Sequence, residues 1–198
     1  MTAQRLRPRD NPFRVERLES LAFRPQGTTW SALLVRLDEL CFRAAIVGAD
    51  GSGKTTLIEE LARRLPLLGF RPMPFAFRPD SSRDAVHATI ARARAAGPAD
   101  VLLVDGADHL PRLDWWRLRH AARRARGLVA TSHRARLLPT LIESRTSVTL
   151  LAELVRELAP EHSQSLDLRL PEVLARHRGN IRTSLLELFD EVARDTRL

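Results

Sequence analysis

The sequence is short of cysteine and has no long apolar run, and each shortage excludes a class of protein. The single cysteine, Cys41, excludes an intrachain disulfide and any metal site built from several cysteines. No run of 18 apolar residues occurs in the 198-residue chain, so no membrane-spanning helix is expected. Residues 1–12 carry arginines with no apolar stretch behind them, which does not resemble a secretory signal. We therefore expect a cytoplasmic protein that does not contact a membrane.

Lysine is also nearly absent, because Lys54 is the only lysine among the 32 basic residues. Exchanging lysine for arginine leaves charge unchanged, so the net charge of +8 needs its own explanation. Between residues 112 and 136 there are eight arginines and a single acid, Asp114. This segment carries +7, and the other 173 residues carry only +1. The positive charge is therefore a local patch.

Short apolar runs alternate along the chain with segments of helical periodicity, which is typical of a parallel sheet with right-handed crossovers. Strands are expected at 42–47, 70–77, 101–105, 128–132 and 147–151. Helices are expected at 29–40, 55–65, 81–96 and 112–126, and again after residue 151 with breaks near Pro160, Pro171 and Gly179. Prolines in the 70–77 segment predict an edge strand, because proline cannot donate to a central ladder.

A glycine-rich segment, Gly48 to Thr55, satisfies the pattern G-x-x-x-x-G-K-[ST] between a predicted strand and a predicted helix. Glycines let the backbone wrap a phosphate, and the exposed N–H groups and the helix N-terminus bind the anion. Lys54 is expected to bridge the β- and γ-phosphates, and the Thr55 hydroxyl to bind Mg²⁺. ATP and Mg²⁺ are thus the expected cofactors. The predicted nucleotide-binding residues are Gly48, Asp50, Gly51, Ser52, Gly53, Lys54, Thr55 and Thr56.

The apolar run 101–105 ends in Asp105, a carboxylate that can hold Mg²⁺ opposite Thr55. With this Walker B pattern the chain resembles the AAA+ and STAND ATPases over roughly residues 42–190. These proteins place an extra strand between the strands that carry the two motifs. The resemblance implies an α/β fold, a P-loop NTPase core with a parallel sheet and helices on both faces. It also implies an ATPase that drives or switches a macromolecular assembly, as a homo-oligomer or with a protein partner.

On this interpretation the chain has three parts. Residues 1–27 form an N-terminal arm and lead-in, residues 28–151 the ATPase core, and residues 152–198 a short helical lid-like region.

The residues after Asp105 depart from most AAA+ proteins, which place a catalytic glutamate next. Here that position is Gly106. The stretch VDGADHL is closer to the D-G-x-D-E form of NACHT-type STAND proteins, with Asp108 at the second acid and His109 where glutamate is usual. Asp108 is the candidate for activating water, and a helix-capping role is the alternative.

Three further residues resemble AAA+ positions. Thr131 ends an apolar run, as does sensor 1, a polar side chain that reaches the γ-phosphate or water. Arg145 matches the S-R of clamp-loader and replication-initiator proteins, and Arg182, in Gly-Asn-Ile-Arg, resembles sensor 2. Strand-end capping and coincidence among 31 arginines are the alternatives. The predicted catalytic set is Lys54, Asp105, Asp108, Thr131, Arg145 and Arg182, and the predicted metal ligands are Thr55 and Asp105.

Two other functions stay open. The loop text D-G-S-G-K-T also resembles that of thymidylate kinases, so a nucleotide or small-molecule kinase is one alternative. Glycine at position 106 favours the other, a nucleotide switch or scaffold that does not hydrolyse ATP.

The basic segment has its own interpretations. Part of it shares one face of the helix predicted over 112–126, opposite Trp115 and Leu118. The arginines on this face are Arg112, Arg119, Arg123 and Arg126. They could neutralise the phosphates of a nucleic acid, dock an acidic partner, or stabilise the helix dipole. Of the adjacent pair Trp115-Trp116, we expect one core residue and one interface residue.

Overall fold

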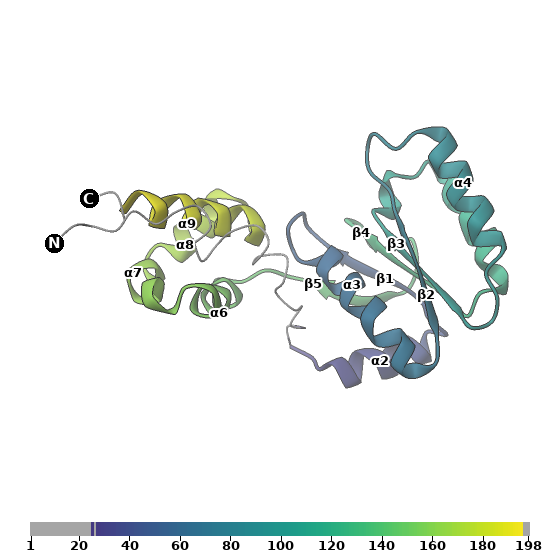
Figure 1. Cartoon of the computed structure of the whole chain (residues 1–198), viewed down its shortest axis with the longest axis horizontal. Coiled ribbons are helices and arrows are strands. Elements are labelled where there is room, and N and C mark those ends of the chain that lie inside the picture. Colours follow the sequence, from purple (N-terminus) through teal and green to yellow (C-terminus); the bar gives the residue numbers. More distant parts are fainter. Residues whose placement is uncertain (1–24, 26, 196–198) are drawn as a thin grey trace. The chain divides into compact units, whose positions relative to one another are not determined.

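The computed structural model describes residue 25 and residues 27–195 (Figure 1). The predicted arm and lead-in, 1–27, therefore lies almost entirely outside the described residues. The described part of the chain divides into two units. The sheet unit contains residues 25, 27–48 and 53–144. The helical unit contains residues 145–195 together with residues 49–52.

The sheet unit contains a parallel sheet of five strands in the order β2-β3-β4-β1-β5 (Figure 1). The strands are β1 (Arg43–Gly48), β2 (Arg71–Ala76), β3 (Asp100–Asp105), β4 (Gly127–Ser132) and β5 (Thr140–Ser144). The expected α/β fold with a parallel sheet is confirmed. The edge position of β2 is confirmed as well, and it accommodates Pro72 and Pro74, which lack the N–H that an inner strand needs.

Helices surround the sheet and make up the helical unit. In the sheet unit they are α2 (Trp30–Glu39), α3 (Lys54–Arg64), α4 (Arg83–Arg94) and α5 (Arg112–Ala121). Short 3₁₀ turns are η2 (Leu65–Leu68), η3 (Ala107–His109), η4 (Ala122–Arg124) and η5 (Pro160–His162). In the helical unit the helices are α6 (Val148–Leu158), α7 (Ser163–Asp167), α8 (Leu170–Arg176) and α9 (Ile181–Asp195).

Alternate residues of β3 face two different sets of helices. Val101 and Leu103 belong to the core cluster built with α2 and α3, whereas Leu102 and Val104 belong to the cluster built with α4 and α5. All four side chains are buried, at about 1.5–3 kcal/mol of stabilisation each. Both faces of β3 are therefore covered, which explains why its sequence is an unbroken apolar run.

The prediction of a strand at 147–151 is wrong, because Ser147 is the N-cap of α6 and residues 148–151 form its first turn. The Ser147 hydroxyl accepts a hydrogen bond from the backbone N–H of Leu150 at 3.0 Å. Leu151, Val155 and Leu158 follow at helical spacing and are buried. The fifth strand is instead β5, a segment with only one fully buried apolar side chain, Leu141.

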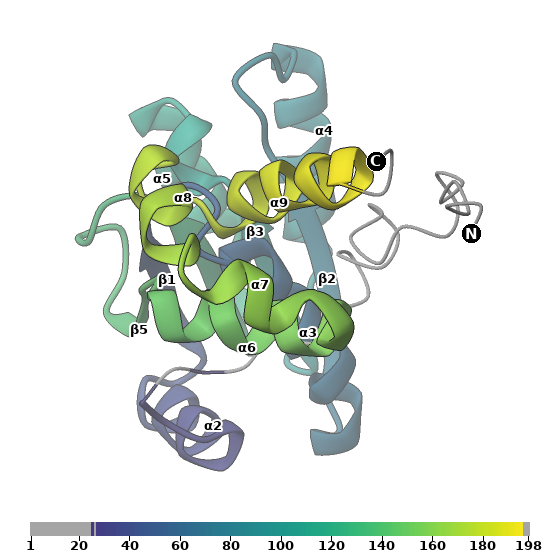
Figure 2. The same cartoon turned by 90° about the vertical axis from the view of Figure 1, so that its left-hand side faces the viewer.

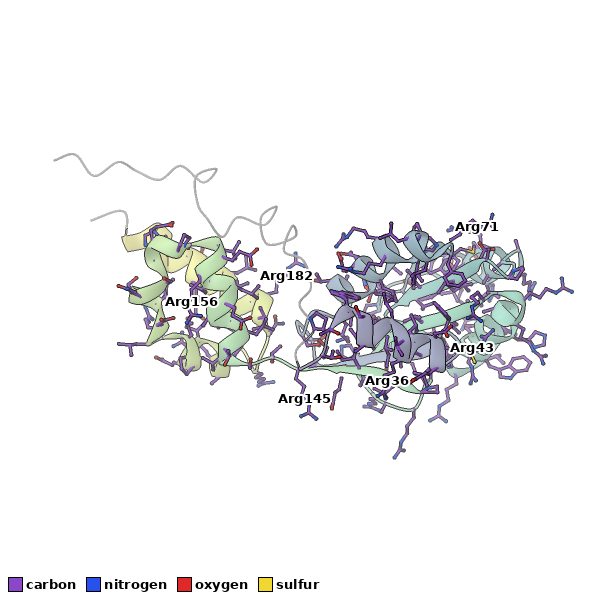
Figure 3. All side chains as sticks on the ribbon, turned by 90° about the horizontal axis from the view of Figure 1, so that it is seen from below. Arg36, Arg43, Arg71, Arg145, Arg156 and Arg182 are labelled. Carbon is purple, nitrogen blue, oxygen red and sulfur yellow. The ribbon has the colours of Figure 1, made fainter. Side chains whose placement is uncertain are left out.

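The helix predicted over 112–126 is shorter than expected. The α-helix α5 ends at Ala121 and continues as the 3₁₀ turn η4. The guanidinium of Arg43 on β1 (Figure 3) donates to the carbonyls of Ala122 at 3.1 Å and Ala125 at 3.4 Å. These bonds satisfy carbonyls at the helix end from outside the helix. Because α5 ends at Ala121 and η4 at Arg124, Arg126 lies outside the helix and is not on the basic face that the sequence predicts.

The helical unit packs α6, α8 and α9 around a core of its own (Figure 2). Leu151, Val155, Leu170, Val173 and Leu188 are among its buried side chains. The division predicted between residues 151 and 152 lies inside α6. None of the helices in the described residues is long and apolar enough to cross a membrane.

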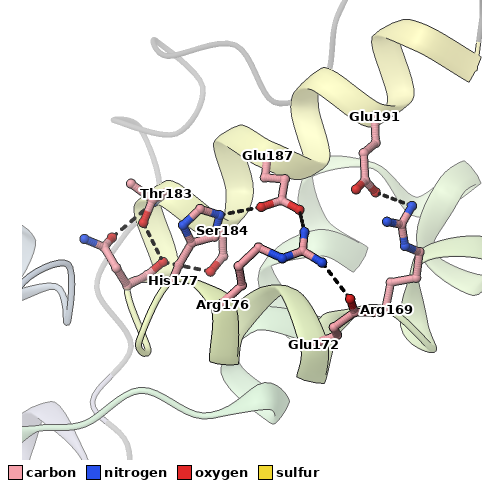
Figure 4. A network of polar contacts seen from close by, with 9 residues as sticks. Arg169, Glu172, Arg176, His177, Thr183, Ser184, Glu187 and Glu191 are labelled. Carbon is pink, nitrogen blue, oxygen red and sulfur yellow. Dashed lines mark hydrogen bonds and ion pairs between the residues drawn. The ribbon is translucent and has the colours of Figure 1, made fainter.

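Polar contacts tie α8 to α9 (Figure 4). Arg176 bonds to Glu187 on α9 and, at 2.6 Å, to Glu172 on its own helix. His177 lies 2.5 Å from the other oxygen of Glu187. These contacts connect the end of α8 to α9 across the short loop of residues 177–180, directly before Arg182.

Candidate functional site

The glycine-rich loop (residues 48–55) joins β1 to α3. Gly51 and Gly53 have φ of +68° and +88°, in the left-handed region that side chains with a Cβ rarely adopt. Gly53 is the N-cap of α3 and has no side chain with which to cap the helix. The N-terminus of α3 carries the positive end of the helix dipole, which favours a negatively charged group. Ser52 is buried, Asp50 is exposed and Thr56 is half-buried.

Lys54 is the first residue of α3, and its side chain folds back over the loop. Its ammonium Nζ donates to the carbonyl of Gly48, at the end of β1, at 2.9 Å. A lysine held in this way places its charge beside the start of the loop.

Asp105, the last residue of β3, is the centre of a polar cluster. Its carboxylate accepts hydrogen bonds from the Thr55 hydroxyl, at 3.1 and 3.3 Å, and from the Thr131 hydroxyl at 2.7 Å. Asp105 is 9% exposed and Thr131 only 1%. Thr55 and Thr131, which the sequence indicated separately from Asp105, therefore both bond to its carboxylate.

The order of the strands explains this meeting. β4 lies between β1 and β3, with Ile46 paired to Thr131 and Val104 to Ala130. All strands are parallel, so their carboxyl ends lie along one edge of the sheet, where ligands of open α/β sheets bind. The Thr131 hydroxyl also accepts from the backbone N–H of Gly106 at 2.8 Å, which joins the ends of β3 and β4.

Arg78 is a member of the cluster that sequence reasoning missed. Its Nη1 lies 3.1 Å from Oδ2 of Asp105, and 57% of its side chain is exposed. The register pairs Ala76 with Asp105, so the residues just after β2 continue to the same sheet edge. The sequence alone does not indicate Arg78, because its place two residues after β2 points to Asp105 only when β2 is known to pair with β3.

Asp108 pairs with His133, which follows β4 and was also missed. The Asp108 carboxylate forms a hydrogen bond with Nδ1 of the His133 ring and accepts from its backbone N–H at 3.4 Å. Burial raises the pKa of Asp108, but the hydrogen bonds and the charge of His133 outweigh it. The net effect is a pKa below the ordinary 3.8. The ring of His109 lies edge-on to that of His133 at 6.3 Å.

Gly106 occupies a position that only glycine fits. Its φ is +75°, and a Cβ there would lie 2.4 Å from the carbonyl oxygen of Phe77 and 2.8 Å from Cδ2 of His109. A backbone oxygen cannot yield as a flexible side chain can. This conformation therefore excludes a glutamate directly after Asp105.

Arg145 and Arg182 belong to the helical unit (Figure 3). Arg145 directly follows β5, and Arg182 is exposed in the first turn of α9. The side chain of Asn180 caps α9 by accepting from the N–H of Thr183 at 3.1 Å. The cap fixes the backbone next to Arg182. The roles predicted for the two arginines stay predictions.

The oxygens of Thr55 and Asp105 suit a hard divalent cation. Mg²⁺ binds through one or two protein oxygens, with water and phosphate completing its octahedron, so a hydroxyl beside a carboxylate fits it. A cage of three or more histidine, cysteine or carboxylate side chains is not found in the described part of the chain.

The basic face predicted on residues 112–126 is changed by the structure. Arg126 bonds to Asp38 at 2.8 Å, and its guanidinium lies over the rings of Phe42 and Phe70, at 4.6 and 5.5 Å. Arg126 is therefore bound to other residues of the sheet unit, and we no longer count it among the arginines that could contact a nucleic acid or an acidic partner. Arg112, Arg119 and Arg123 stay exposed.

A scan against protein-family models and a search of curated protein sequences each found no match to the chain.

Proposed function

We propose that the chain binds Mg·ATP in the glycine-rich loop and hydrolyses it. The observation that carries this proposal is the cluster at Asp105, where Thr55 from the start of α3 and Thr131 from the end of β4 bond to the same buried carboxylate. A hydroxyl and a carboxylate from separate elements, beside a loop that carries the only lysine, form the set that P-loop ATPases use for Mg²⁺ and phosphate.

The strand order supports the AAA+ or STAND type. That resemblance implies a strand between those that lead to the glycine-rich loop and to Asp105, and β4 takes this place between β1 and β3. The inserted strand also brings Thr131 to Asp105. Its bond to Asp105 supports the sensor 1 role that we propose for Thr131.

Each residue then has a role that its contacts allow. The backbone N–H groups of the loop and of the first turn of α3 would bind the phosphates. Lys54 would leave the Gly48 carbonyl and bond to phosphate oxygens, while Thr55 and Asp105 would hold Mg²⁺. The metal ion supplies charge neutralisation on the phosphates.

For the proton of the attacking water we assign the Asp108–His133 pair in place of Asp108 alone. A carboxylate whose pKa is lowered binds a proton weakly and is a poor base near neutral pH. The His133 imidazole is held in one orientation by its Nδ1 contact with the Asp108 carboxylate, and its other ring nitrogen, when unprotonated, can accept the proton of water. The pair thus fills the role that the missing glutamate would have.

A second candidate function, a nucleotide switch that does not hydrolyse ATP, is favoured by Gly106. Its backbone excludes the usual catalytic glutamate. On this alternative Asp108 and His133 only connect the ends of β3 and β4, and the chain signals through ATP binding itself.

Phosphate release and ATP binding, measured on the same samples, separate these functions. We expect the full chain to release phosphate from Mg·ATP without any acceptor. Thr55→Ala and Asp105→Asn should weaken Mg-dependent ATP binding about 10- to 150-fold, the effect of losing a bond to a charged group. Thr149→Ala and Asp84→Asn, matched changes at exposed helix positions, should have no effect.

His133→Asn tests the assignment of the base. We expect turnover to fall about 100-fold with ATP affinity retained, since general-base catalysis contributes at least that factor. ATP binding with turnover at background, unchanged in His133→Asn, would establish the switch. ATP consumption only after a nucleoside monophosphate is added would establish a kinase.

A further inference from the structure

The outer face of α5 and η4 (residues 112–124) carries large apolar side chains that the fold does not use. Trp115 and Leu118 on the inner face are buried against the sheet. On the outer face Leu113 is 57% exposed and Trp116 is 61% exposed. The predicted core residue of the pair Trp115-Trp116 is thus Trp115, and the interface role of Trp116 stays a prediction. Large apolar side chains grouped on an exposed face can mark an interaction site.

Trp116 is held in a defined orientation. Its ring stacks on that of His120, one turn further along the helix, with centroids 5.6 Å apart and an angle of 23° between the planes. The imidazole supports one face of the indole. A supported ring loses little conformational entropy when a planar group stacks on it.

The same segment carries arginines without acidic partners in the described residues. Within the described residues no ion pair is formed by Arg112, Arg119, Arg123 or Arg124, and all four are exposed. Arg117, in contrast, is neutralised by Asp114 at 3.0 Å. Arg112 lies in the first turn of α5, where the helix dipole disfavours a cation. Helix stability therefore does not explain its position.

Helix geometry places Trp116 between Arg112 and Arg119 on the surface of α5. Arg112 precedes Trp116 by four residues and Arg119 follows it by three, so all three lie on one face. At 1.5 Å per residue, the two arginines are about 10 Å apart along the axis, with the indole between them. A base stacked on the ring would have a cation available to the phosphate on either side.

We propose that the outer face of α5 binds single-stranded nucleic acid, with a base stacked on Trp116 and flanking phosphates on Arg112 and Arg119. Aromatic platforms among cations bind single strands with little sequence preference, because every base has a π-face. The bases of a duplex are already stacked on each other and offer no face to the indole. An acidic protein would use the cations but would not need a supported flat ring. The inference does not depend on ATP binding.

Binding of a fluorescein-labelled oligothymidylate of about 20 nucleotides to the full chain, without nucleotide, tests the proposal. Trp116→Ala should weaken binding about 5- to 150-fold, the range measured for one stacked base, and Trp116→Phe should retain most of the affinity. Stacking should also quench the tryptophan fluorescence of the wild type, and Trp116→Phe should lose this quenching.

The arginines are tested by the salt dependence. Arg112→Ala with Arg119→Ala should make the slope of log K against log salt shallower by about 1.4, or 0.7 for each phosphate contact. Arg83→Ala with Arg94→Ala removes the same charge from α4, where both arginines are exposed, and should leave the slope unchanged. All these positions are exposed, so the variants should fold, which circular dichroism checks.

Three results would overturn the proposal: no binding by the folded wild type, equal binding by Trp116→Ala, or equal slopes for the two double variants. Binding of polyglutamate that depends equally on Trp116 would assign the face to an acidic protein instead.

Discussion

Replacing Thr131 with valine tests how the ends of β3 and β4 are joined. Valine has nearly the same shape but lacks the hydroxyl. The Thr131 hydroxyl donates to Asp105 at 2.7 Å and accepts from the N–H of Gly106 at 2.8 Å, in a position that is 1% exposed. The change therefore removes two hydrogen bonds without opening a cavity.

The expected loss follows from these bonds. A hydrogen bond to a charged group contributes about 1.5–3 kcal/mol, and an unsatisfied buried N–H costs about 1–3 kcal/mol. Asp105 keeps Thr55 and Arg78 as donors, so we expect a total near the lower end, about 2–4 kcal/mol. With a urea m-value of about 2 kcal/mol per molar, the unfolding midpoint should fall by about 1–2 M.

Tryptophan fluorescence during urea unfolding is the assay. All three tryptophans, Trp30, Trp115 and Trp116, lie in the sheet unit, so the signal reports on this unit alone. Thr131→Ser keeps the hydroxyl and loses only a methyl group, at about 1 kcal/mol, so it should unfold closer to the wild type. A midpoint for Thr131→Val within about 0.5 M of the wild type would refute the argument, because the hydroxyl would then hold nothing together.

Further predictions concern the same edge of the sheet. Gly106→Ala should lower the free energy of unfolding by at least about 2 kcal/mol, because its Cβ would meet the Phe77 carbonyl and its φ is +75°; urea unfolding measures this, and a neutral result would contradict the backbone described. Arg78→Ala should reduce the Mg²⁺ concentration needed for half-maximal ATP binding about two- to fivefold, because a cation competing for Asp105 is removed; an increase would mean that Arg78 helps to bind the nucleotide. The lowered pKa of Asp108 stabilises the fold above pH 3.8 and ceases to do so as the pH falls through the folded-state value. The stability gap between the wild type and Asp108→Asn, measured in urea at pH 6 and pH 3, should therefore narrow at the lower pH.

Much of the sheet could be predicted because its inner strands are buried on both faces. The apolar runs Val101–Val104 in β3 and Leu128–Ala130 in β4 are continuous for that reason. β5 pairs with only one neighbour and has one buried apolar side chain, so its pattern was too weak to find. Residues 147–151 contain more apolar side chains than β5, so their pattern predicts a strand where the structure has the start of α6.

The residues missed at the site depend on which strands are neighbours. Thr55, Asp105 and Thr131 each stand in a recognisable local pattern. Arg78 and His133 do not, and they reach Asp105 and Asp108 only through the register of β2 on β3 and of β4 on β3. The contacts of Arg126 could not be predicted from the sequence either, because its partners Asp38 and Phe42 are distant in the sequence.

Calorimetric titration of the full chain with ATP in the presence of Mg²⁺ tests the central claim most directly. We predict saturable heat with one site per chain, and a 10- to 150-fold weaker affinity, as an order-of-magnitude value, in Lys54→Ala. Arg63→Ala removes one positive charge from the exposed side of the same helix and should bind ATP as the wild type does. A folded wild type that gives no heat, or a Lys54→Ala variant that binds equally well, would contradict the account.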